Sequence, residues 1–403
     1  MINHNLPKNW EVKTLAEVCT SKNSNIVLSS IENNTGKYPI YGAKGLLKTI
    51  DFYTIENESL GIVKDGAGVG RIFLLPEKSS LIGTMAYIQA NKNLNLKYLY
   101  HFLHTINFNQ YISGSAIPHI YFRDYKKEKI PLPPLATQKL IVEKLENAFA
   151  HIDEAVHHLK AVQTNIPRLK SSLLHSAFSG KLTESQNSSH KVQTLKSVVG
   201  EKGEFEREEG ATSPFKPLHP LIKTEIPQGW EFKTLGEVCE FVYGKALNQT
   251  KRKTNGKYPV YAANGIKDYS DEFMISENSI IVGRKGSVGS VVLTSSPCWV
   301  LDVAYYVNFD KEKYNLVFLY HLLKYLNLKQ FARGVKPGIS RSQIYELQVV
   351  MPPLATQNQI VQILESKFTH LDNLAQFVNE SLENLQKLKS SLLNQAFKGE
   401  LIC

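Results

Sequence analysis

Two segments of the chain carry apolar residues at alternating spacings of three and four, which is the heptad pattern of helices that pack along a narrow seam. The apolar positions are Val142, Leu145, Phe149, Ile152, Val156 and Leu159 in the first segment, and Val361, Leu364, Phe368, Leu371, Ala375, Val378, Leu382 and Leu385 in the second. Polar residues flank both stripes. The pattern therefore favours two long paired helices over ordinary core helices of a bundle.

Prolines and glycines mark the ends of both predicted helices. Pro133-Pro134 and Pro352-Pro353 precede the stripes, where proline is tolerated at a helix start. Gly180 and Gly399 follow the last apolar turns, where a glycine cap is expected. Each helix then runs roughly 44 residues, or about 65 Å. Pro167 predicts a kink or break in the first helix, because proline removes a backbone donor.

A turn-rich stretch with short runs of strand-forming residues comes before each helix. Ser59–Val63 and Arg71–Leu75 read as strands in the first stretch, and Ser279–Val282 and Ser290–Leu293 play the same roles in the second. We expect each stretch to fold as a mixed domain with a small curved sheet and some short helices. The fold class is α+β.

The chain repeats itself. Pro-Leu-Ala-Thr-Gln and Leu-Lys-Ser-Ser-Leu-Leu each occur twice, 219 residues apart, at Pro134–Gln138, Pro353–Gln357, Leu169–Leu174 and Leu388–Leu393. Upstream, Pro-x-x-Trp ending at Trp10 recurs ending at Trp230, and Cys19 recurs as Cys239 in what reads as a small buried slot. The duplicated unit predicts a pseudo-twofold molecule. Because a whole domain separates the two helices, we expect them to pack antiparallel.

Five segments follow from these patterns: a domain at 1–132, a helix at 133–182, a linker at 183–226, a second domain at 227–351 and a second helix at 352–403. The linker combines a mixed-charge run at 201–209 with three prolines, Pro214, Pro217 and Pro220. This composition is typical of a solvated connector.

Composition narrows the functional classes. A formal charge of +10 and a pI near 9.1 favour a polyanionic partner, with nucleic acid before an anionic membrane. The four cysteines form no disulfide framework and no zinc-spaced cluster. A signal peptide and a span of about 18 apolar residues are missing, so the cytoplasm is the expected location and no membrane is expected as a partner.

The motifs of common catalytic sites are not matched. Gly66-Ala67-Gly68-Val69-Gly70 has GxGxG spacing and is followed by a strand-like run, so it predicts a tight turn between strands rather than a dinucleotide site. Gly180-Lys181 lacks the rest of a phosphate-binding loop, and the double prolines lack the flanking residues of an amino-methyltransferase motif. We see no metal-ligand pattern either. The chain is expected to bind rather than catalyse.

Basic, amide and hydroxyl residues recur on glycine-hinged loops of both domains. Such groups pair with phosphates and base edges. The Tyr-Pro-x-Tyr stretches at 38–41 and 258–261 are more simply explained as domain cores. The candidate DNA-binding residues are Lys44, Lys64, Arg71, His119, Arg123, Lys245, Asn264, Arg284, Lys285, Lys336, Ser340, Arg341 and Gln343.

The ordered set of duplicated features resembles the specificity subunit of type I restriction–modification enzymes over nearly the entire chain. The resemblance implies two target-recognition domains, each reading one half of a bipartite, asymmetric site in double-stranded DNA. It also implies that the helices set the spacing and dock two methylation subunits, which restriction (translocase/endonuclease) subunits join. S-adenosylmethionine, ATP and Mg are then expected on those partners, with no cofactor on this chain.

Physical dimensions agree with this expectation. A rod of about 65 Å spans roughly 19 base pairs, enough to hold two readers one helical turn apart. Two other functions stay open from the sequence: a self-contained DNA methyltransferase with diverged motifs, and a coiled-coil scaffold that binds only protein.

Overall fold

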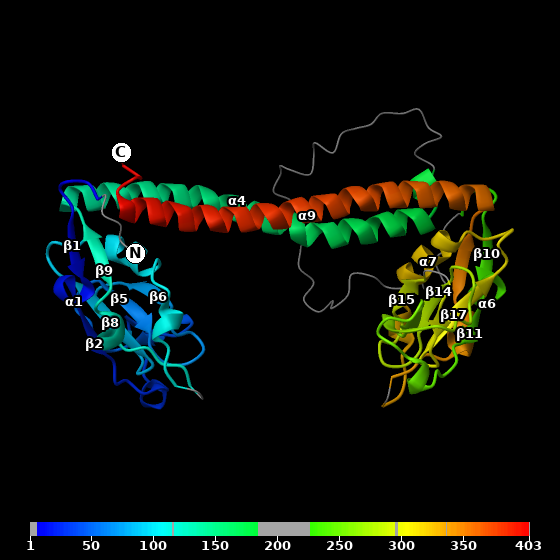
Figure 1. The fold of residues 1–403 in the computed structure, drawn as a ribbon, viewed down its shortest axis with the longest axis horizontal. Helices are drawn as coiled ribbons and strands as arrows, with labels where there is room; N and C mark the ends of the chain where they lie inside the picture. The colour runs from blue at the N-terminus through cyan, green and yellow to red at the C-terminus, as the bar shows by residue number, and fades with distance from the viewer. Residues whose placement is uncertain (1–5, 115–116, 184–225, 295–296, 336, 403) are drawn as a thin grey trace. The chain divides into compact units, whose positions relative to one another are not determined.

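The computed structural model describes residues 6–114, 117–183, 226–294, 297–335 and 337–402 (Figure 1). The chain forms two compact units. The first contains residues 1–162 and 377–403, and the second contains residues 163–376. Each unit therefore combines one mixed domain with parts of both long helices. The predicted linker, at 183–226, lies outside the described residues except for its two ends.

The domain of the first unit contains three small sheets rather than the single one expected from the sequence. A four-stranded antiparallel sheet has the order β2-β8-β5-β6, a three-stranded sheet has the order β4-β3-β7, and β1 pairs with β9. The strands are β1 (Glu11–Thr14), β2 (Cys19–Asn23), β3 (Tyr38–Gly42), β4 (Gly45–Ile50), β5 (Ser59–Val63), β6 (Ile72–Leu75), β7 (Ser80–Leu81), β8 (Met85–Ala90) and β9 (Lys129–Leu132). The helices of this domain are α1 (Leu15–Val18), α2 (Leu96–Leu103) and α3 (Phe122–Tyr125), with short 3-10 turns at Leu28–Ile31 and Phe108–Tyr111.

The domain of the second unit repeats this topology. The four-stranded sheet has the order β11-β17-β14-β15, the three-stranded sheet has the order β13-β12-β16, and β10 pairs with β18. The strands are β10 (Glu231–Thr234), β11 (Cys239–Tyr243), β12 (Tyr258–Ala262), β13 (Gly265–Ser270), β14 (Ile280–Gly283), β15 (Val291–Leu293), β16 (Trp299–Val300), β17 (Ala304–Phe309) and β18 (Gln348–Met351). The helices of this domain are α6 (Leu235–Val238), α7 (Leu316–Tyr325) and α8 (Arg341–Tyr345), with 3-10 turns at Gln249–Lys251 and Leu328–Phe331.

Local sequence explains how each domain begins. The Glu17 carboxylate accepts hydrogen bonds from the Thr14 amide (2.6 Å) and hydroxyl (2.7 Å), and Glu237 does the same for Thr234. This reciprocal cap starts the one-turn helices α1 and α6. The cysteines that follow, Cys19 and Cys239, are buried, as the duplicated slot predicts.

The turn at 66–70 joins β5 to β6, as its sequence predicts. Gly66 and Gly70 have φ angles of +92° and +84°, which favour glycine. The Gly70 amide donates to Val63 O at 2.9 Å, and the Val63 amide donates to Arg71 O at the same distance. The glycines therefore serve a strand-to-strand turn.

The long helices are α4 (Leu135–Phe178) and α9 (Leu354–Lys398). They begin directly after the double prolines. Gly180 and Gly399 have φ angles of +80° and +81°, and Glu400 donates to Gln395 O as in a Schellman cap. Of the two expected effects of Pro167, a break is wrong, because α4 continues through this residue. A kink there stays a prediction. One lost hydrogen bond is a small fraction of those that hold a helix of this length.

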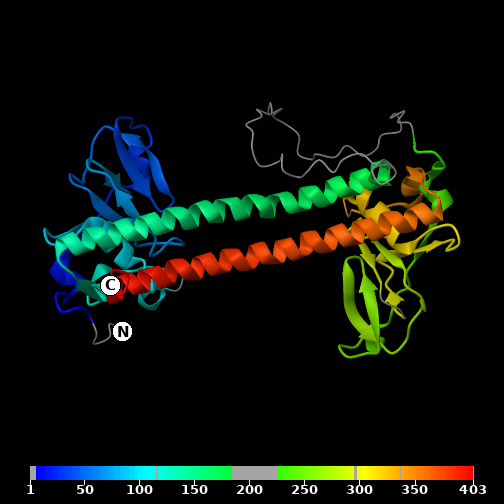
Figure 2. The same cartoon turned by 90° about the horizontal axis from the view of Figure 1, so that it is seen from above.

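Within each unit the two helices lie side by side with opposite directions, as Figures 1 and 2 both show. In the first unit, Lys389 of α9 contacts Asp153 of α4 at 2.5 Å and lies 5.1 Å from the Phe149 ring. In the second unit, Lys170 of α4 makes the same two contacts with α9, to Asp372 at 2.5 Å and to the Phe368 ring at 5.6 Å. These partners lie 219 residues apart, so the sequence repeat extends to individual side-chain contacts.

The residues of the predicted seam are all withdrawn from solvent to some degree. Val142, Leu145, Ile152, Val361, Leu364 and Val378 are buried, and Phe149, Val156, Leu159, Phe368, Leu371, Leu382 and Leu385 are partly buried. The ends of the helices also enter the domain cores. Ala396 and Phe397 of α9 join the core of the first unit, and Ala177 and Phe178 of α4 join that of the second.

Candidate nucleic-acid interface

The first domain gathers several of its candidate residues on two adjoining loops. The loop after β5 carries Lys64 and Asp65, and the loop before α3 carries His119. The Ile120 amide donates to Lys64 O (2.9 Å), and the Gly66 amide donates to Pro118 O (2.9 Å). Segments more than 50 residues apart in the sequence therefore meet at one place.

An acidic residue holds two of these side chains. Asp65 contacts Lys64 Nζ and His119 Nδ1, each at 2.8 Å. Partial burial raises the pKa of the Asp65 carboxyl, but the hydrogen bonds from Lys64 and His119 outweigh it and hold that pKa below its usual range. Asp65 thus stays ionised and offsets the charge on Lys64.

Arg123 is the more accessible cation of this site. Its guanidinium lies 4.5 Å from the centre of the Tyr121 ring, and the His119 ring stacks against the same tyrosine at 6.2 Å. A cavity of about 230 Å³ opens beside them, lined by Lys64, Tyr121, Arg123 and residues of β2. The cavity presents an aromatic face, a guanidinium and an ammonium group together.

Lys44 and Arg71 come together at a neighbouring position. Arg71 Nη1 donates to Ala43 O at 2.6 Å, which ties the turn after β5 to the β3–β4 hairpin. Lys44 follows Ala43 directly, and both cations are exposed. Two positive charges therefore face solvent near the tip of that hairpin.

The second domain builds its site around one tyrosine. The guanidinium groups of Arg284 and Arg341 lie 5.0 Å and 4.6 Å from the centre of the Tyr243 ring. Arg284 Nη1 also donates to Asp302 O (2.9 Å), and Arg341 Nη1 donates to Phe241 O (3.1 Å). Among the described residues, each guanidinium is anchored through one nitrogen, which leaves its other donors for a ligand.

This tyrosine lies beside a larger cavity of about 550 Å³. Its lining includes Glu240, Tyr243, Ser340, Arg341 and Tyr345. Burial raises the pKa of the adjacent Tyr305 to about 12, its hydrogen bond with Tyr243 adds to this, and the two arginines act against it. The phenol therefore stays neutral and donates to Ile339 O at 3.0 Å.

The other candidates of the second domain are exposed at its edge. Lys245, Asn264, Lys285, Ser340 and Gln343 all face solvent. Lys285 forms a backbone bridge with Gly338, as Asp65 does with His119 in the first domain. Lys336 lies outside the described residues.

The two sites occupy corresponding places but use different side chains. Each lies between the strand after the first short helix, β2 or β11, and the loop before α3 or α8. The stacking tyrosine comes from the loop in the first domain and from β11 in the second. The candidate residues predicted from the sequence include neither Tyr121 nor Tyr243. Tyr243 is about 40 and 100 residues from its arginines, so no local pattern connects it to them, whereas Tyr121 lies close to Arg123 in the sequence and could have been included.

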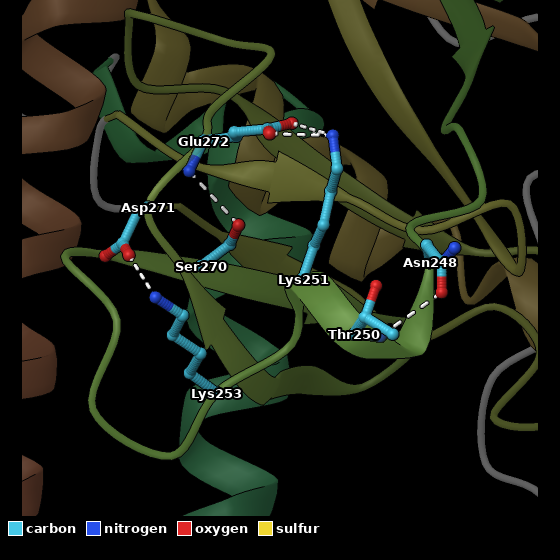
Figure 3. Close-up of polar contacts among 7 residues, drawn as sticks. All are labelled: Asn248, Thr250, Lys251, Lys253, Ser270, Asp271 and Glu272. Carbon is cyan, nitrogen blue, oxygen red and sulfur yellow. Dashed lines mark hydrogen bonds and ion pairs between the residues drawn. The ribbon is translucent and has the colours of Figure 1, made fainter.

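Other lysines of the second domain are paired with acids. Figure 3 shows Lys251 against both oxygens of Glu272 (2.7 and 3.0 Å) and Lys253 against Asp271 (2.5 Å). Both lysines are about half exposed, so these pairs stabilise the protein only slightly. Their neutralised charge makes them weaker candidates for phosphate contact than Arg284 and Arg341.

The part of the chain that the structure describes contains no recognisable metal-binding site. No group of three or more His, Cys, Asp or Glu is placed there to hold a metal ion. Among the same residues, no helix has the length and apolar character needed to cross a bilayer.

Two like-built mixed domains joined to long helices are the organisation of a class of DNA-specificity proteins. The family model for the type I restriction modification DNA specificity domain matches residues 7–162 and 227–384. The chain therefore belongs to this family. It is a non-catalytic specificity subunit whose two recognition domains each read one half of a DNA site, and this membership favours neither the methyltransferase nor the scaffold alternative.

Curated relatives agree along the whole length. The EcoDI specificity subunit of Escherichia coli is 21% identical, with 98% of this chain and 89% of the relative covered. The MjaVIII specificity subunit of Methanocaldococcus jannaschii is 23% identical, with 98% and 94% covered.

Solved structures show the same fold. A chain from a study of complex assembly and conformational transition of the type I R-M system matches with a TM-score of 0.72 at 16% identity, covering 99% of this chain and 100% of that one. The HsdS subunit from Thermoanaerobacter tengcongensis matches with a TM-score of 0.58, also at 16% identity, covering 98% of each chain.

Proposed function

We propose that the two tyrosine–guanidinium sites are the points at which this specificity subunit reads DNA. In the second domain, Arg284 and Arg341 would contact bases or phosphates, and the Tyr243 ring would keep their guanidinium groups in place. In the first domain, Arg123 on Tyr121 would play that part. The observation that carries this proposal is the occurrence of stacked guanidinium groups beside a cavity at corresponding places in both domains.

Guanidinium groups suit this task because they are planar, permanently charged and able to donate two parallel hydrogen bonds to guanine or phosphate. Stacking on a ring reduces the freedom they lose on binding. The remaining exposed candidates, Lys44, Arg71, Lys245, Lys285 and Gln343, would contact the backbone around each site. Because the two sites differ in sequence, the half-sites they read should differ too.

Charge distribution supports the same assignment. Residues 1–132 contain 15 Lys and Arg against 10 Asp and Glu, and residues 227–351 contain 16 against 11. The remainder of the chain is balanced, with 16 of each. The whole positive surplus therefore belongs to the proposed recognition domains, where polyanion binding needs it.

The proposed partners follow from the family. Two methylation subunits would dock on the paired helices, and restriction subunits would join them in the cytoplasm. S-adenosylmethionine, ATP and Mg would be bound by those partners and not by this chain.

The test is a methylome comparison of the host with and without this gene, with the partner genes expressed. We expect one bipartite adenine-methylation motif that disappears on deletion and returns on complementation. The Arg341→Ala variant should relax only one half of that motif. An unchanged methylome after deletion of the gene contradicts the proposed function. If Arg341→Ala and Arg284→Ala both leave the two halves of the motif unchanged, the assignment of the sites is wrong.

A further inference from the structure

Two glutamines are buried completely at the points where the recognition domains meet the long helices. Gln138 and Gln357 each occupy the first turn of their helix, and each has an exposed fraction of 0%. A buried primary amide is costly unless its donors and acceptor are satisfied. The contacts of both side chains therefore indicate what they hold together.

The Gln138 side chain joins three pieces of backbone. Its Nε2 donates to Asn93 O (2.9 Å) and to Pro133 O (2.8 Å), and its Oε1 accepts from the Asn95 amide (2.8 Å). Asn95 caps α2 by accepting from the Tyr98 amide at 3.0 Å. One side chain thus ties the start of α4 to the start of α2.

Gln357 repeats this arrangement in the second unit. Its Nε2 donates to Lys313 O (3.0 Å) and Pro352 O (2.9 Å), and its Oε1 accepts from the Asn315 amide (2.8 Å). Asn315 caps α7, and its side chain also donates to Asn358 Oδ1 at 2.8 Å. Because Gln138 and Gln357 make equivalent hydrogen bonds in the two units, we expect them to have the same role.

The short helices held by these glutamines pack against the long helices. Both α2 and α7 contact α4 and α9 through aromatic pairs with ring centres 5.0–5.6 Å apart: His101–Phe149, Tyr98–Phe397, His321–Phe368 and Phe318–Phe178. The orientation of each domain on the helices therefore depends on how α2 or α7 is held.

We infer that Gln138 and Gln357 are positioning residues that set which spacing between the two half-sites the protein accepts. This inference rests on the proposed function. One added base pair moves a half-site by about 3.4 Å and turns it by roughly 36°. A domain held to its helix by the hydrogen bonds of a fully buried glutamine cannot follow that change, whereas a domain with a loosened joint can.

The experiment uses the full chain with its methylation subunits and a plasmid library in which the spacer between the half-sites varies in length. The variants are Gln138→Glu and Gln357→Glu, which keep the size and an acceptor but lose both donors. The control is Gln362→Ala, which changes an exposed glutamine of the same helix α9. Methylation of each spacer class is read by sequencing.

We expect the parent and the control to methylate one spacer length, and the two variants to accept lengths one base pair away. The preference for the original spacer should fall about tenfold or more, with the half-site bases unchanged. A third variant disturbs the joint less. Asn358→Ala removes only the exposed bond to Asn315, and it should reduce the preference to a smaller degree.

A purely structural role for the glutamines predicts a different result, in which thermal stability falls while the single spacer is kept. That result in folded Gln138→Glu, Gln357→Glu and Asn358→Ala overturns the inference. Failure of the proposed function is distinguishable, because the parent complex would then methylate no bipartite motif at all.

Discussion

At the scale of single residues, identical sequence positions in the two repeats perform identical structural tasks, whereas the proposed reading positions differ. Cys19 and Cys239 occupy the same buried slot, and burial raises the pKa of each thiol to about 12, so both are inert at neutral pH. Tyr121 and Tyr243, by contrast, have no counterpart in the other domain. The two repeats therefore differ at the proposed DNA-reading positions.

Arg341 offers the sharpest test at this scale. The Arg341→Ala variant should weaken binding to the second half-site by roughly 10- to 100-fold, since a good base contact is worth about 1–3 kcal/mol. Arg341→Lys should recover little of this, because an ammonium group cannot stack or donate in a plane. Titration with DNA carrying either half-site altered measures the effect.

The matched control for Arg341 is Lys251→Ala, which removes a cation already paired with Glu272 in the same domain (Figure 3). It should change affinity only slightly. Equal losses for the two variants would show that charge alone, and not the site on Tyr243, determines binding.

Two buried histidines should make stability depend on pH. Burial lowers the pKa of His101 and of His321 to about 4. Well above pH 6.5 both histidines are neutral in the folded and in the unfolded protein, so they do not make the free energy of unfolding depend on pH there. Between pH 6.5 and 4 the unfolded chain binds more protons, and the free energy of unfolding falls, by on the order of 3 kcal/mol per histidine at most.

Urea unfolding at pH 7.5 and pH 5 measures this effect. The His101→Phe and His321→Phe variants should each flatten the pH dependence. The exposed His151→Phe variant serves as a control and should leave it unchanged. An unaltered pH profile in both buried-site variants would rule out these histidines as the cause.

At the scale of elements, the paired helices are held by an apolar seam with matching polar contacts at its edge. Asp153–Lys389 and Asp372–Lys170 are partly exposed pairs, so their direct contribution to stability is small. Each lysine also covers a phenylalanine of the partner helix. The apolar seam must therefore supply most of the pairing energy.

Placing a charge in that seam should loosen it. Phe149→Glu and Leu371→Glu should each lower the free energy of unfolding by about 3 kcal/mol or more, since they remove apolar packing and bury a carboxylate. Broadened half-site spacing or weaker docking of methylation subunits should accompany the loss. Chemical denaturation and methylation of the spacer library report the two effects.

Phe377→Glu is the control for the seam, because Phe377 is an aromatic residue of α9 that is 62% exposed. It should leave stability within about 0.5 kcal/mol of the parent. Unchanged stability in Phe149→Glu and Leu371→Glu would mean that the seam does not hold the helices together.

At the scale of the whole molecule, binding should be governed by phosphate contacts from two separate domains. With six to ten such contacts, affinity should fall by about 10³- to 10⁵-fold between 50 and 200 mM salt. Fluorescence anisotropy over that range gives the slope of affinity against salt. A slope near zero would contradict the assignment of the positive surplus to DNA binding.

The sequence alone was enough to predict the long helices, their ends, the tandem domains and the family. The heptad spacing of apolar residues and the prolines and glycines at the helix ends are local features of the sequence. The tandem domains are visible because the chain repeats its own motifs. A break at Pro167 was the wrong alternative, because the many hydrogen bonds of a long helix outweigh the loss of one. The sequence also predicted a single small sheet, whereas strand pairings between distant segments divide each domain into three.

Only the tertiary structure decided the character of the sites. Whether Lys64 is available depends on Asp65 and His119, and the platform for Arg284 and Arg341 depends on Tyr243. In the sequence Gln138 is an ordinary polar residue, whereas in the fold its buried side chain connects the start of α4 to the start of α2. Charge neutralisation, ring stacking and burial are set by which residues meet across the chain, and a linear pattern does not contain that information.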